Sequence, residues 1–499
     1  MPTRRDFITT IGASVSIGAL SSVTVLTQKK SSTVAPLDAY PSLERQLRTL
    51  ADATAKPFTA GQELRLDASS GAYAASTSAT SVTRGQRGQL IAPNGLLTFA
   101  IDVSEPAYVS GELLLVADAD LRPGLRAYVL CDTTLVGAPM IAARDWGTTE
   151  VTAPAPRVTG LRASREIRLR DWLLPAGRHY LTVAGPHLRA AGSFQSLTLR
   201  PLSRAVRDPL YSFAFISDTH LYGKRERLDW MNRKMGDATG AEFRRTLEAL
   251  SREPISFVMH GGDMTETAVR GEFEEFAGIL ASQSLPVYAC LGNHDVYLET
   301  SRRDALELLG EHFPGGALDY TFSKAPVRFV VMDVEIEKPD ALARKQDWLR
   351  RTLEADRRTP TIFVWHYAPY NRGGLSSCGF RMFDWSELGK RALLDILQGA
   401  PNVFATLNGH DHWDEVNYLG GIAHVQNAAF VEWPNTYRVV RVYSDRIEWE
   451  VRQVANRGYV RESCVPEKAL SWMIATRETD LTGEVPLRRA RTTGDRFEP

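Results

Sequence analysis

Side chains that bind metals gather in five short blocks, and each block follows a run of apolar residues. The chain has 499 residues but only ten histidines, so their grouping is informative. The blocks are Asp218-Thr219-His220, Gly262-Asp263, Gly292-Asn293-His294-Asp295, His366 and Gly409-His410-Asp411-His412. Their imidazole, carboxylate and amide donors suit Zn, Mn, Fe or Co better than Ca²⁺, which prefers all-oxygen sites. The residue types therefore predict a metal site.

The candidate donors are too many for one ion, so two divalent or trivalent ions that share a carboxylate are expected. Two ions about 3.5–4 Å apart hold the attacking and leaving oxygens in a displacement at phosphorus. Glycines beside Asp263, Asn293 and His410 let the backbone turn sharply where the ions would sit. The blocks thus point to hydrolysis at phosphorus, with Mn, Fe, Zn and Co all open as the metal.

Apolar runs that end at these blocks are expected to be β-strands. The runs are 213–216, 255–258, 287–291, 361–365 and 403–407. In open α/β sheets, ligands gather at the carboxyl ends of strands, so residues far apart in sequence meet at one edge. Helical periodicity is expected over 242–252, 272–283 and 345–356. Strands that alternate with helices indicate an α/β domain over residues 210–455.

The segments on either side of this domain have different patterns of apolar and polar residues. Residues 61–203 carry short apolar or alternating runs between turn residues, which predicts an all-β sandwich domain. Two roles are open for this domain. It packs against the neighbouring domain or covers it as a lid, without a ligand of its own, or it binds a glycan or an envelope surface. Residues 456–499 are polar and charged, and predict a solvated tail or a wrapping arm.

The first 35 residues resemble an export signal with its linker. Arg4-Arg5 followed by Phe7-Ile8 resembles the twin-arginine signal, whose cargo folds before export, and residues 7–28 carry no charge. The twin-arginine export machinery is therefore an expected partner, with a periplasmic or extracellular location. A weak small-residue cleavage site at 33–35 leaves an uncleaved N-terminal membrane anchor open. A short helix is expected over 43–55.

Taken in order, the five blocks resemble the motifs of the calcineurin-like metallophosphoesterase superfamily. The resemblance covers Asp218 to His412. It implies an α/β catalytic domain whose central β-sandwich of mixed sheets is flanked by helices in four αββα layers. It also implies a metal-dependent phosphoric ester hydrolase, a phosphodiesterase or phosphomonoesterase that acts on a small phosphoester substrate.

The resemblance also implies a role for each block. It assigns the first ion to Asp218, His220 and His412, the second ion to Asn293, His366 and His410, and the bridge between them to Asp263. A hydroxide between the ions would attack phosphorus, because bound metals lower the pKa of water. His294 would contact a phosphoryl oxygen or protonate the leaving group. Asp295 would orient His294, as carboxylates often orient imidazoles.

The block around Asp263 separates branches of the superfamily. Purple acid phosphatases have a Tyr ligand shortly after this block, whereas here Met264-Thr265-Glu266 follow. A redox-active purple iron site is therefore not expected. The Asp-x-His and Gly-Asn-His-Asp forms resemble the cyclic-nucleotide and glycerophosphodiester phosphodiesterase branch more closely.

Other conspicuous residues are expected to be structural. Those near the blocks are His260 at a strand end, Asp411 pointing away from the ions, and Trp365, Tyr367 and Trp413 in packing. Elsewhere we expect structural roles for His179, His187, His312 and His424, and a buried thiol at Cys290. Phosphate contact stays open for Tyr222, Asn371 and Arg372.

Overall charge limits the partners. Lys plus Arg and Asp plus Glu both number 59, so the formal net charge is zero. A protein that holds nucleic acid by a general basic field is therefore not expected. Two alternatives to the exported phosphoesterase remain: a nuclease with the same metal chemistry, and an envelope-associated binding protein that docks through its β domain.

Overall fold

The computed structural model describes most of the chain from residue 54 onward. The described residues are 54–67, 73–75, 84–85, 88–90, 96–118, 125–126, 128–138, 140–141, 147–148, 162–184, 193–221, 234–335, 339–370, 384–464, 472 and 475–489. The predicted export signal lies outside them, as do the predicted helix over 43–55 except its last two residues, and His187, Tyr222, Asn371 and Arg372. Within the described part, no helix combines the length and apolar character needed to cross a bilayer.

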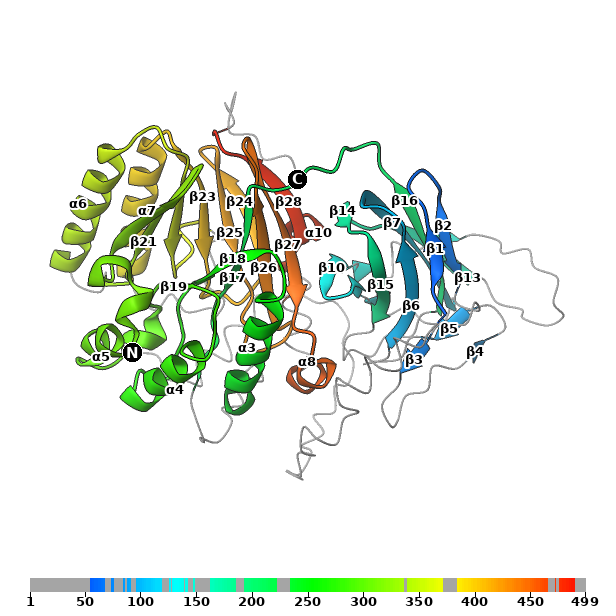
Figure 1. The fold of residues 1–499 in the computed structure, drawn as a ribbon, viewed down its shortest axis with the longest axis horizontal. Helices are drawn as coiled ribbons and strands as arrows, with labels where there is room; N and C mark the ends of the chain where they lie inside the picture. Colours follow the sequence, from blue (N-terminus) through cyan, green and yellow to red (C-terminus); the bar gives the residue numbers. More distant parts are fainter. Residues whose placement is uncertain are drawn as a thin grey trace, which may run out of the picture. The chain divides into compact units, whose positions relative to one another are not determined.

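Two mixed sheets form the centre of the α/β region (Figure 1). The first is part of a twelve-stranded sheet that continues into the N-terminal strands. In this region it runs in the order β28 (Thr482–Pro486), β27 (Arg446–Gln453), β26 (Thr436–Val442), β17 (Tyr211–Ile216), β18 (Ile255–His260) and β19 (Val287–Ala289). The second runs in the order β20 (Tyr320–Lys324), β21 (Val327–Met332), β22 (Thr361–Trp365), β23 (Val403–Asn408), β25 (Ile422–Gln426) and β24 (Glu415–Leu419). The central strands of each sheet are parallel, and antiparallel strands lie beside them.

Side-chain alternation along β18 shows how the layers pack, because successive residues of a strand face opposite sides. Phe257 meets Phe329 of the second sheet, with ring centroids 5.6 Å apart. His260, on the other side of β18, meets Phe243 of α3 and Phe276 of α4 at 5.9 and 5.2 Å. One face of the first sheet therefore packs on the second sheet, and the other face is covered by helices.

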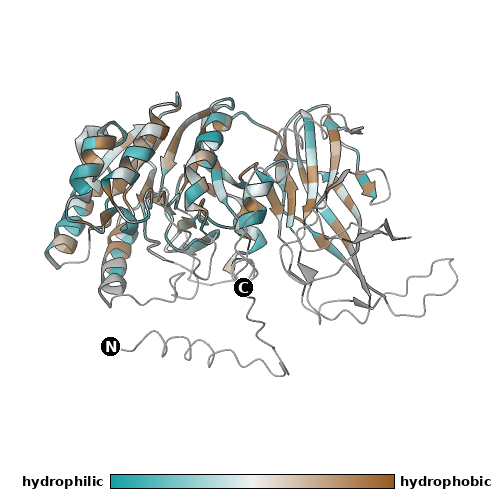
Figure 2. Ribbon diagram, turned by 90° about the horizontal axis from the view of Figure 1, so that it is seen from below, coloured by the Kyte–Doolittle hydropathy of each residue, from teal (hydrophilic) through white to brown (hydrophobic). Residues whose placement is uncertain are grey.

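Helices cover the outer sides of both sheets. They are α3 (Gly236–Leu250), α4 (Arg270–Leu280), α5 (Ser301–Leu309), α6 (Pro339–Ala355) and α7 (Asp384–Gly399). Leu349 and Leu353 of α6 share a buried cluster with Trp365 of β22. Figure 2 shows the sheets as largely hydrophobic and the helices as mixed, with polar residues interspersed. The predicted α/β fold with mixed sheets is confirmed.

The five predicted strands are all present, but two of the predicted helices begin much too late. The prediction over 242–252 corresponds to α3, which begins at Gly236, and the prediction over 345–356 corresponds to α6, which begins at Pro339. The first turns, Gly236-Asp237-Ala238-Thr239 and Pro339-Asp340-Ala341-Leu342, contain Gly or Pro and small residues, so the periodic apolar stripe becomes clear only further along each helix. Helices α5 and α7 have no counterpart among the predictions.

The described residues before β17 form strands. They are β1 (Lys56–Phe58), β2 (Leu64–Asp67), β3 (Tyr73–Ala75), β4 (Arg84–Gly85), β5 (Gly88–Leu90), β6 (Leu96–Val103), β7 (Ala107–Asp118), β8 (Leu125–Arg126), β9 (Tyr128–Cys131), β10 (Thr134–Gly137), β11 (Met140–Ile141), β12 (Gly147–Thr148), β13 (Arg162–Arg168), β14 (Trp172–Leu174), β15 (Gly177–Ala184) and β16 (Ser193–Pro201). Strands of two sheets share one apolar core, with Phe99 and Leu181 from one sheet and Leu113 and Leu197 from the other. This arrangement agrees with the predicted β texture, and an independent sandwich domain over 61–203 stays a prediction.

The prediction of a solvated tail over 456–499 is wrong for its described part. Strand β28 pairs with β27 from Arg446 to Glu450. Helices α8 (Arg457–Ser463) and α10 (Glu478–Leu481) precede it, and Leu481 and Val485 are buried. Single apolar residues among charged ones suffice for an edge strand with one buried face, which is why composition suggested a tail.

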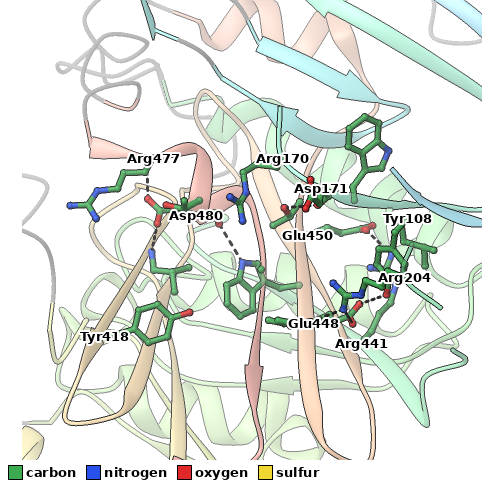
Figure 3. Close-up of a pocket in the computed structure, with 18 residues that line it drawn as sticks. Tyr108, Arg170, Asp171, Arg204, Tyr418, Arg441, Glu448, Glu450, Arg477 and Asp480 are labelled. Carbon is green, nitrogen blue, oxygen red and sulfur yellow. Dashed lines mark hydrogen bonds and ion pairs between the residues drawn. The ribbon is translucent and has the colours of Figure 1, made fainter. Parts of the chain in front are cut away.

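A polar cavity of about 420 Å³ lies where the N-terminal strands meet the first sheet (Figure 3). Its walls carry paired charges: Arg204 contacts Glu448 at 2.5 Å, and Arg441 contacts Glu450 at 2.6 Å. Tyr108 of β7 also donates to Glu448 at 2.8 Å. None of the residues that line it belongs to the predicted metal set. The cavity is therefore separate from the metal chemistry, and its arginines and carboxylates largely balance each other.

One buried histidine of the N-terminal region has an oxygen acceptor beside each of its ring nitrogens. His179 Nδ1 lies 2.7 Å from an Asp132 carboxylate oxygen, and Nε2 lies 2.9 Å from the Pro175 carbonyl oxygen. Both ring nitrogens donate only when the imidazole is protonated. Burial lowers the pKa of His179, but the hydrogen bond to Asp132 and its charge outweigh burial and raise it. Because both nitrogens are engaged, the grouping of Cys131, Asp132 and His179 is a poor metal site.

We expect a pH-dependent stabilisation from this histidine. Since its folded-state pKa is raised, the contribution is complete below the unfolded value of about 6.5 and is lost as pH rises through the folded pKa. Wild type should exceed His179→Gln in unfolding free energy by about 1 kcal/mol at low pH, with half-exposed Asp132 limiting the size. NMR titration of the His179 imidazole and denaturant unfolding at several pH values measure this. A difference between the two proteins that is constant with pH would contradict the assignment.

Candidate functional site

Backbone conformations with positive φ are concentrated at the predicted site. Only eight described residues other than glycine have positive φ, and five of these are predicted ligands: Asp218, His220, Asp263, His410 and His412, with φ between 44° and 73°. Such conformations are uncommon for residues with a Cβ and concentrate where function requires them. Each follows the end of β17, β18 or β23, where the chain leaves the sheet edge. The turns direct these side chains back across the edge.

One group of ligand atoms converges around His220. The donor atoms of Asp218, His220, Asp263 and His412 all lie within 4.8 Å of one another, and all four residues are buried. His220 Nε2 lies 3.3 Å from His412 Nε2 and 3.6 Å from Asp263 Oδ2. His412 Nε2 lies 3.3 Å from Asp218 Oδ1. The strand ends therefore bring together residues separated by almost two hundred positions of sequence.

A second group shares Asp263 with the first. The donor atoms of Asp263, His366 and His410 lie within 4.8 Å of one another. His366 Nε2 is 3.2 Å from Asp263 Oδ2 but has no hydrogen-bond partner of good geometry among the described residues. The buried Oδ1 of Asn293 also lacks a hydrogen-bond partner within the described part. Asn293 sits beside this group, because the next residue, His294, donates its backbone N–H to Asp263 at 2.8 Å.

The donor set fits a cation between the groups. His220 Nδ1 and His412 Nδ1 contact carboxylate oxygens of Glu266 and Glu432 at 2.7 and 2.6 Å. Carboxylates only accept, so each Nδ1 carries a proton, and each Nε2 offers a lone pair toward the other ring whenever its ring is neutral. Lone pairs and carboxylates that meet in a buried space repel one another unless a positive charge lies between them.

The pKa values of the imidazoles also indicate that this site favours a positive charge. Burial lowers the pKa of His366, but the charges of Asp263 and Asp218 outweigh burial and raise it to about 9. The pKa of His412 is raised to about 9 by Glu432 and Asp218 against the same effect of burial. Burial would raise the pKa of Asp263, yet the surrounding imidazoles hold it well below its usual range. Protons stand in for the missing positive charge when no metal is bound.

Glycines keep the space between the groups small. A Cβ on Gly292 would overlap the Asp263 carboxylate, and a Cβ on Gly409 would overlap the Ser217 hydroxyl and approach Asp218 Oδ2 to 2.5 Å. Both positions therefore exclude any side chain. These glycines are required mainly because other parts of the backbone and side chains lie so close to them. Their conformational freedom, on which the prediction was based, matters less.

The predicted contact between Asp295 and His294 is wrong. Asp295 accepts hydrogen bonds from the backbone N–H groups of Gly292, Met264 and Thr265, at 2.9, 3.2 and 2.8 Å. His294 Nδ1 instead donates to the Glu266 carbonyl oxygen at 2.8 Å. Asp295 thus holds two site loops together, because its position at the start of a 3₁₀ turn points the carboxylate at backbone amides. Burial lowers the pKa of His294 to about 4, which makes it neutral.

Most of the residues expected to be structural have structural environments. His260 is buried under α3 and α4, and neither it nor Asp411 belongs to a ligand group of the described residues. Trp365 is buried in a core cluster, and Tyr367 and Trp413 pack against core clusters. His424 and Cys290 are buried, and His312 contacts the Val287 carbonyl oxygen.

Three charged residues beside the site have no place in the motifs. Glu266 and Glu432 contact the two imidazoles described above, and Lys234 contacts Glu266 at 2.9 Å. Glu266 comes three residues after Asp263, where polar spacing offers a weak signal. Glu432 and Lys234 lie in connections between elements and carry no local pattern.

Comparison with known proteins agrees with this geometry. Residues 211–414 match the family model of the calcineurin-like phosphoesterases. A dimetal phosphatase from Danio rerio is 18% identical, over 49% of this chain and 97% of its own, with a TM-score of 0.41. A 5′-nucleotidase-like protein of Staphylococcus aureus is 14% identical, over 49% of this chain and 54% of its own, with a TM-score of 0.32. A xylanase carbohydrate-binding module from the hindgut metagenome of Trinervitermes trinervoides is 8% identical, over 29% of this chain and 100% of its own, with a TM-score of 0.22. No curated protein matches the chain.

The solved structures resemble the chain too distantly to add to the assignment, which depends on the family match. That match begins at the first residue of β17 and ends two residues after His412, so it includes all five blocks. Residues 211–414 are therefore similar to the calcineurin-like phosphoesterase family, and both ligand groups draw their residues from this segment.

Proposed function

We propose that this protein is an exported phosphoesterase that uses two metal ions to hydrolyse a small phosphoester. The observation that carries the proposal is the pair of ligand groups that share Asp263. A shared carboxylate between two sets of imidazoles is the arrangement that a pair of ions requires, and a single structural ion would leave one set without a purpose.

Each group has enough donors for one ion. Asp218, His220 and His412 would hold the first, Asn293, His366 and His410 the second, and Asp263 both. The partnerless Asn293 Oδ1 and His366 Nε2 support the second position, since a buried polar atom normally has a partner. When bound, such ions activate water for attack and offset the negative charge that develops on the phosphoryl oxygens. Mn, Fe, Zn and Co all suit the donors.

His294 is the protein group best placed to move a proton during the reaction. Its ring lies 4.6 Å from that of His220, and its side chain keeps some contact with solvent. The Glu266 carbonyl oxygen fixes Nδ1 as a donor, which leaves Nε2 as the atom that takes up a proton and, once protonated, donates to a phosphoryl or leaving-group oxygen. Asp295 acts on the loops and not on the ring.

Export and the N-terminal strands complete the proposal. The twin-arginine-like residues at the start of the chain suit a protein that loads its metal before it crosses the membrane. The N-terminal strands would cover or pack the phosphoesterase domain, and glycan or envelope binding is the further role proposed for them. Near-neutral charge favours a small substrate over nucleic acid.

Loss of a shared or second-group ligand should remove both metal and activity. We expect Asp263→Asn and His366→Gln to abolish hydrolysis of p-nitrophenyl phosphate and bis(p-nitrophenyl) phosphate, with less metal in the purified protein. His312→Gln is the matched control, because His312 contacts the Val287 carbonyl oxygen and Glu311 and belongs to neither ligand group. Metal analysis and turnover of both esters measure the outcome. Full activity in Asp263→Asn would refute the site.

Removal of His294 should separate chemistry from metal binding. His294→Ala is expected to keep its metal and to slow turnover by roughly 10²–10⁴-fold, the usual contribution of proton transfer by a positioned side chain. The measurement is kcat together with metal content. Retained activity with lost metal would show that His294 is a ligand and not a proton-transfer group.

The two alternatives predict different results in the same assays. Cleavage of a DNA or RNA oligomer faster than the small diester would favour a nuclease. A metal-loaded protein that turns over none of the esters, yet binds envelope glycans, would favour a binding protein.

A further inference from the structure

Two buried carboxylates outside the family motifs each contact one imidazole of the first ligand group. Glu266 Oε2 lies 2.7 Å from His220 Nδ1, and Glu432 Oε1 lies 2.6 Å from His412 Nδ1. Glu432 is fully buried, and the Glu266 side chain is 8% exposed. Contacts this short between buried groups hold the rings in one orientation, because rotation would leave a buried carboxylate without its partner.

The carboxylates reach the group from opposite parts of the chain. Glu266 follows β18 in the loop that also contains Asp263, and Glu432 lies in the connection between β25 and β26. Lys234, just before α3, donates to Glu266 at 2.9 and 3.3 Å. The ammonium group also lies 3.4 Å from His220 Nδ1, so it holds the Glu266 carboxylate beside the ring nitrogen that Glu266 contacts.

The second ligand group has a different support. His366 Nδ1 contacts the Gly261 carbonyl oxygen at 2.8 Å, which is a neutral acceptor. A carboxylate partner makes an imidazole a stronger electron donor than a carbonyl partner does, and such outer contacts typically change metal affinity 10- to 100-fold. His366 therefore has a weaker outer partner than His220 and His412 have.

We propose that Glu266 and Glu432 are positioning residues of the metal position formed by Asp218, His220 and His412. They fix the tautomer and direction of the two imidazoles, and they strengthen binding of the ion at this position. The inference rests on the proposed function, since it assigns support to that same pair of positions.

Zinc titration of the metal-free protein tests the proposal without any turnover assay. Isothermal calorimetry with Zn²⁺ alone should show two binding steps for wild type. Glu432→Ala and Glu266→Ala should weaken one step by about 10- to 100-fold and leave the other unchanged. Glu432→Gln and Glu266→Gln should give intermediate losses, because the amide oxygen still accepts from Nδ1 but has no charge.

A buried carboxylate elsewhere in the same domain provides the matched control. Glu242 on α3 is 2% exposed and accepts from Asn456 and Arg245, away from the ligand groups. Glu242→Gln should bind zinc as wild type does. Thermal unfolding of each metal-free variant checks the fold, and the Gln variants keep the test valid if an Ala variant is unstable.

The outcomes separate this proposal from the proposed function. Two unchanged steps in all four variants, or equal weakening of both steps, would overturn the positioning role while leaving the phosphoesterase intact. Selective weakening of one step in a wild-type protein that hydrolyses no ester would support the positioning role and count against the enzyme. A wild type that binds no zinc would overturn both.

Discussion

An excess of electron pairs in a space closed to water is the constraint on which the rest of this structure depends. Asp218 and Asp263 meet the Nε2 atoms of His220, His366 and His412 within a few ångströms, and all five residues are buried. Such a cluster would repel itself and lose solvation if nothing positive stood within it. Protons can supply that charge, as the raised pKa values of His366 and His412 indicate. The proposed pair of metal ions would supply it with the imidazoles neutral.

The fold provides the rigidity that this concentration of charge requires. Parallel strands end at one edge, so the turns after β17, β18 and β23 approach one another whatever their separation in sequence. Positive φ at five of the ligand residues costs energy that the packed sheets must outweigh. Glycine at 292 and 409 lets the turns come closer than any other residue would. The ends of these strands therefore determine where the candidate metal-binding side chains lie.

Sequence reasoning was most reliable where a residue's role depends on its immediate neighbours. Asp218, Asp263 and His410 follow apolar strands and sit beside or within short polar turns, so both their place and their convergence could be predicted. Glu432 contacts His412 only because β25, β26 and the intervening connection fold over the site, and no local pattern records that. Asp295 was assigned to the wrong partner, because composition shows that a carboxylate is present but not which donor it faces. The C-terminal segment was misjudged for a similar reason: β28 is recognisable as a strand only beside β27.

The pairing of β28 with β27 also bears on how the protein is made. Residues 482–486 pair with β27 from Arg446 to Glu450, next to the single pair that β10 makes with β27 at Arg452. During synthesis this stretch of β27 therefore stays unpaired until β28 has left the ribosome, and open edges invite pairing with other chains. Premature termination shortly before residue 482 would spare every metal-binding block yet release an aggregation-prone polypeptide.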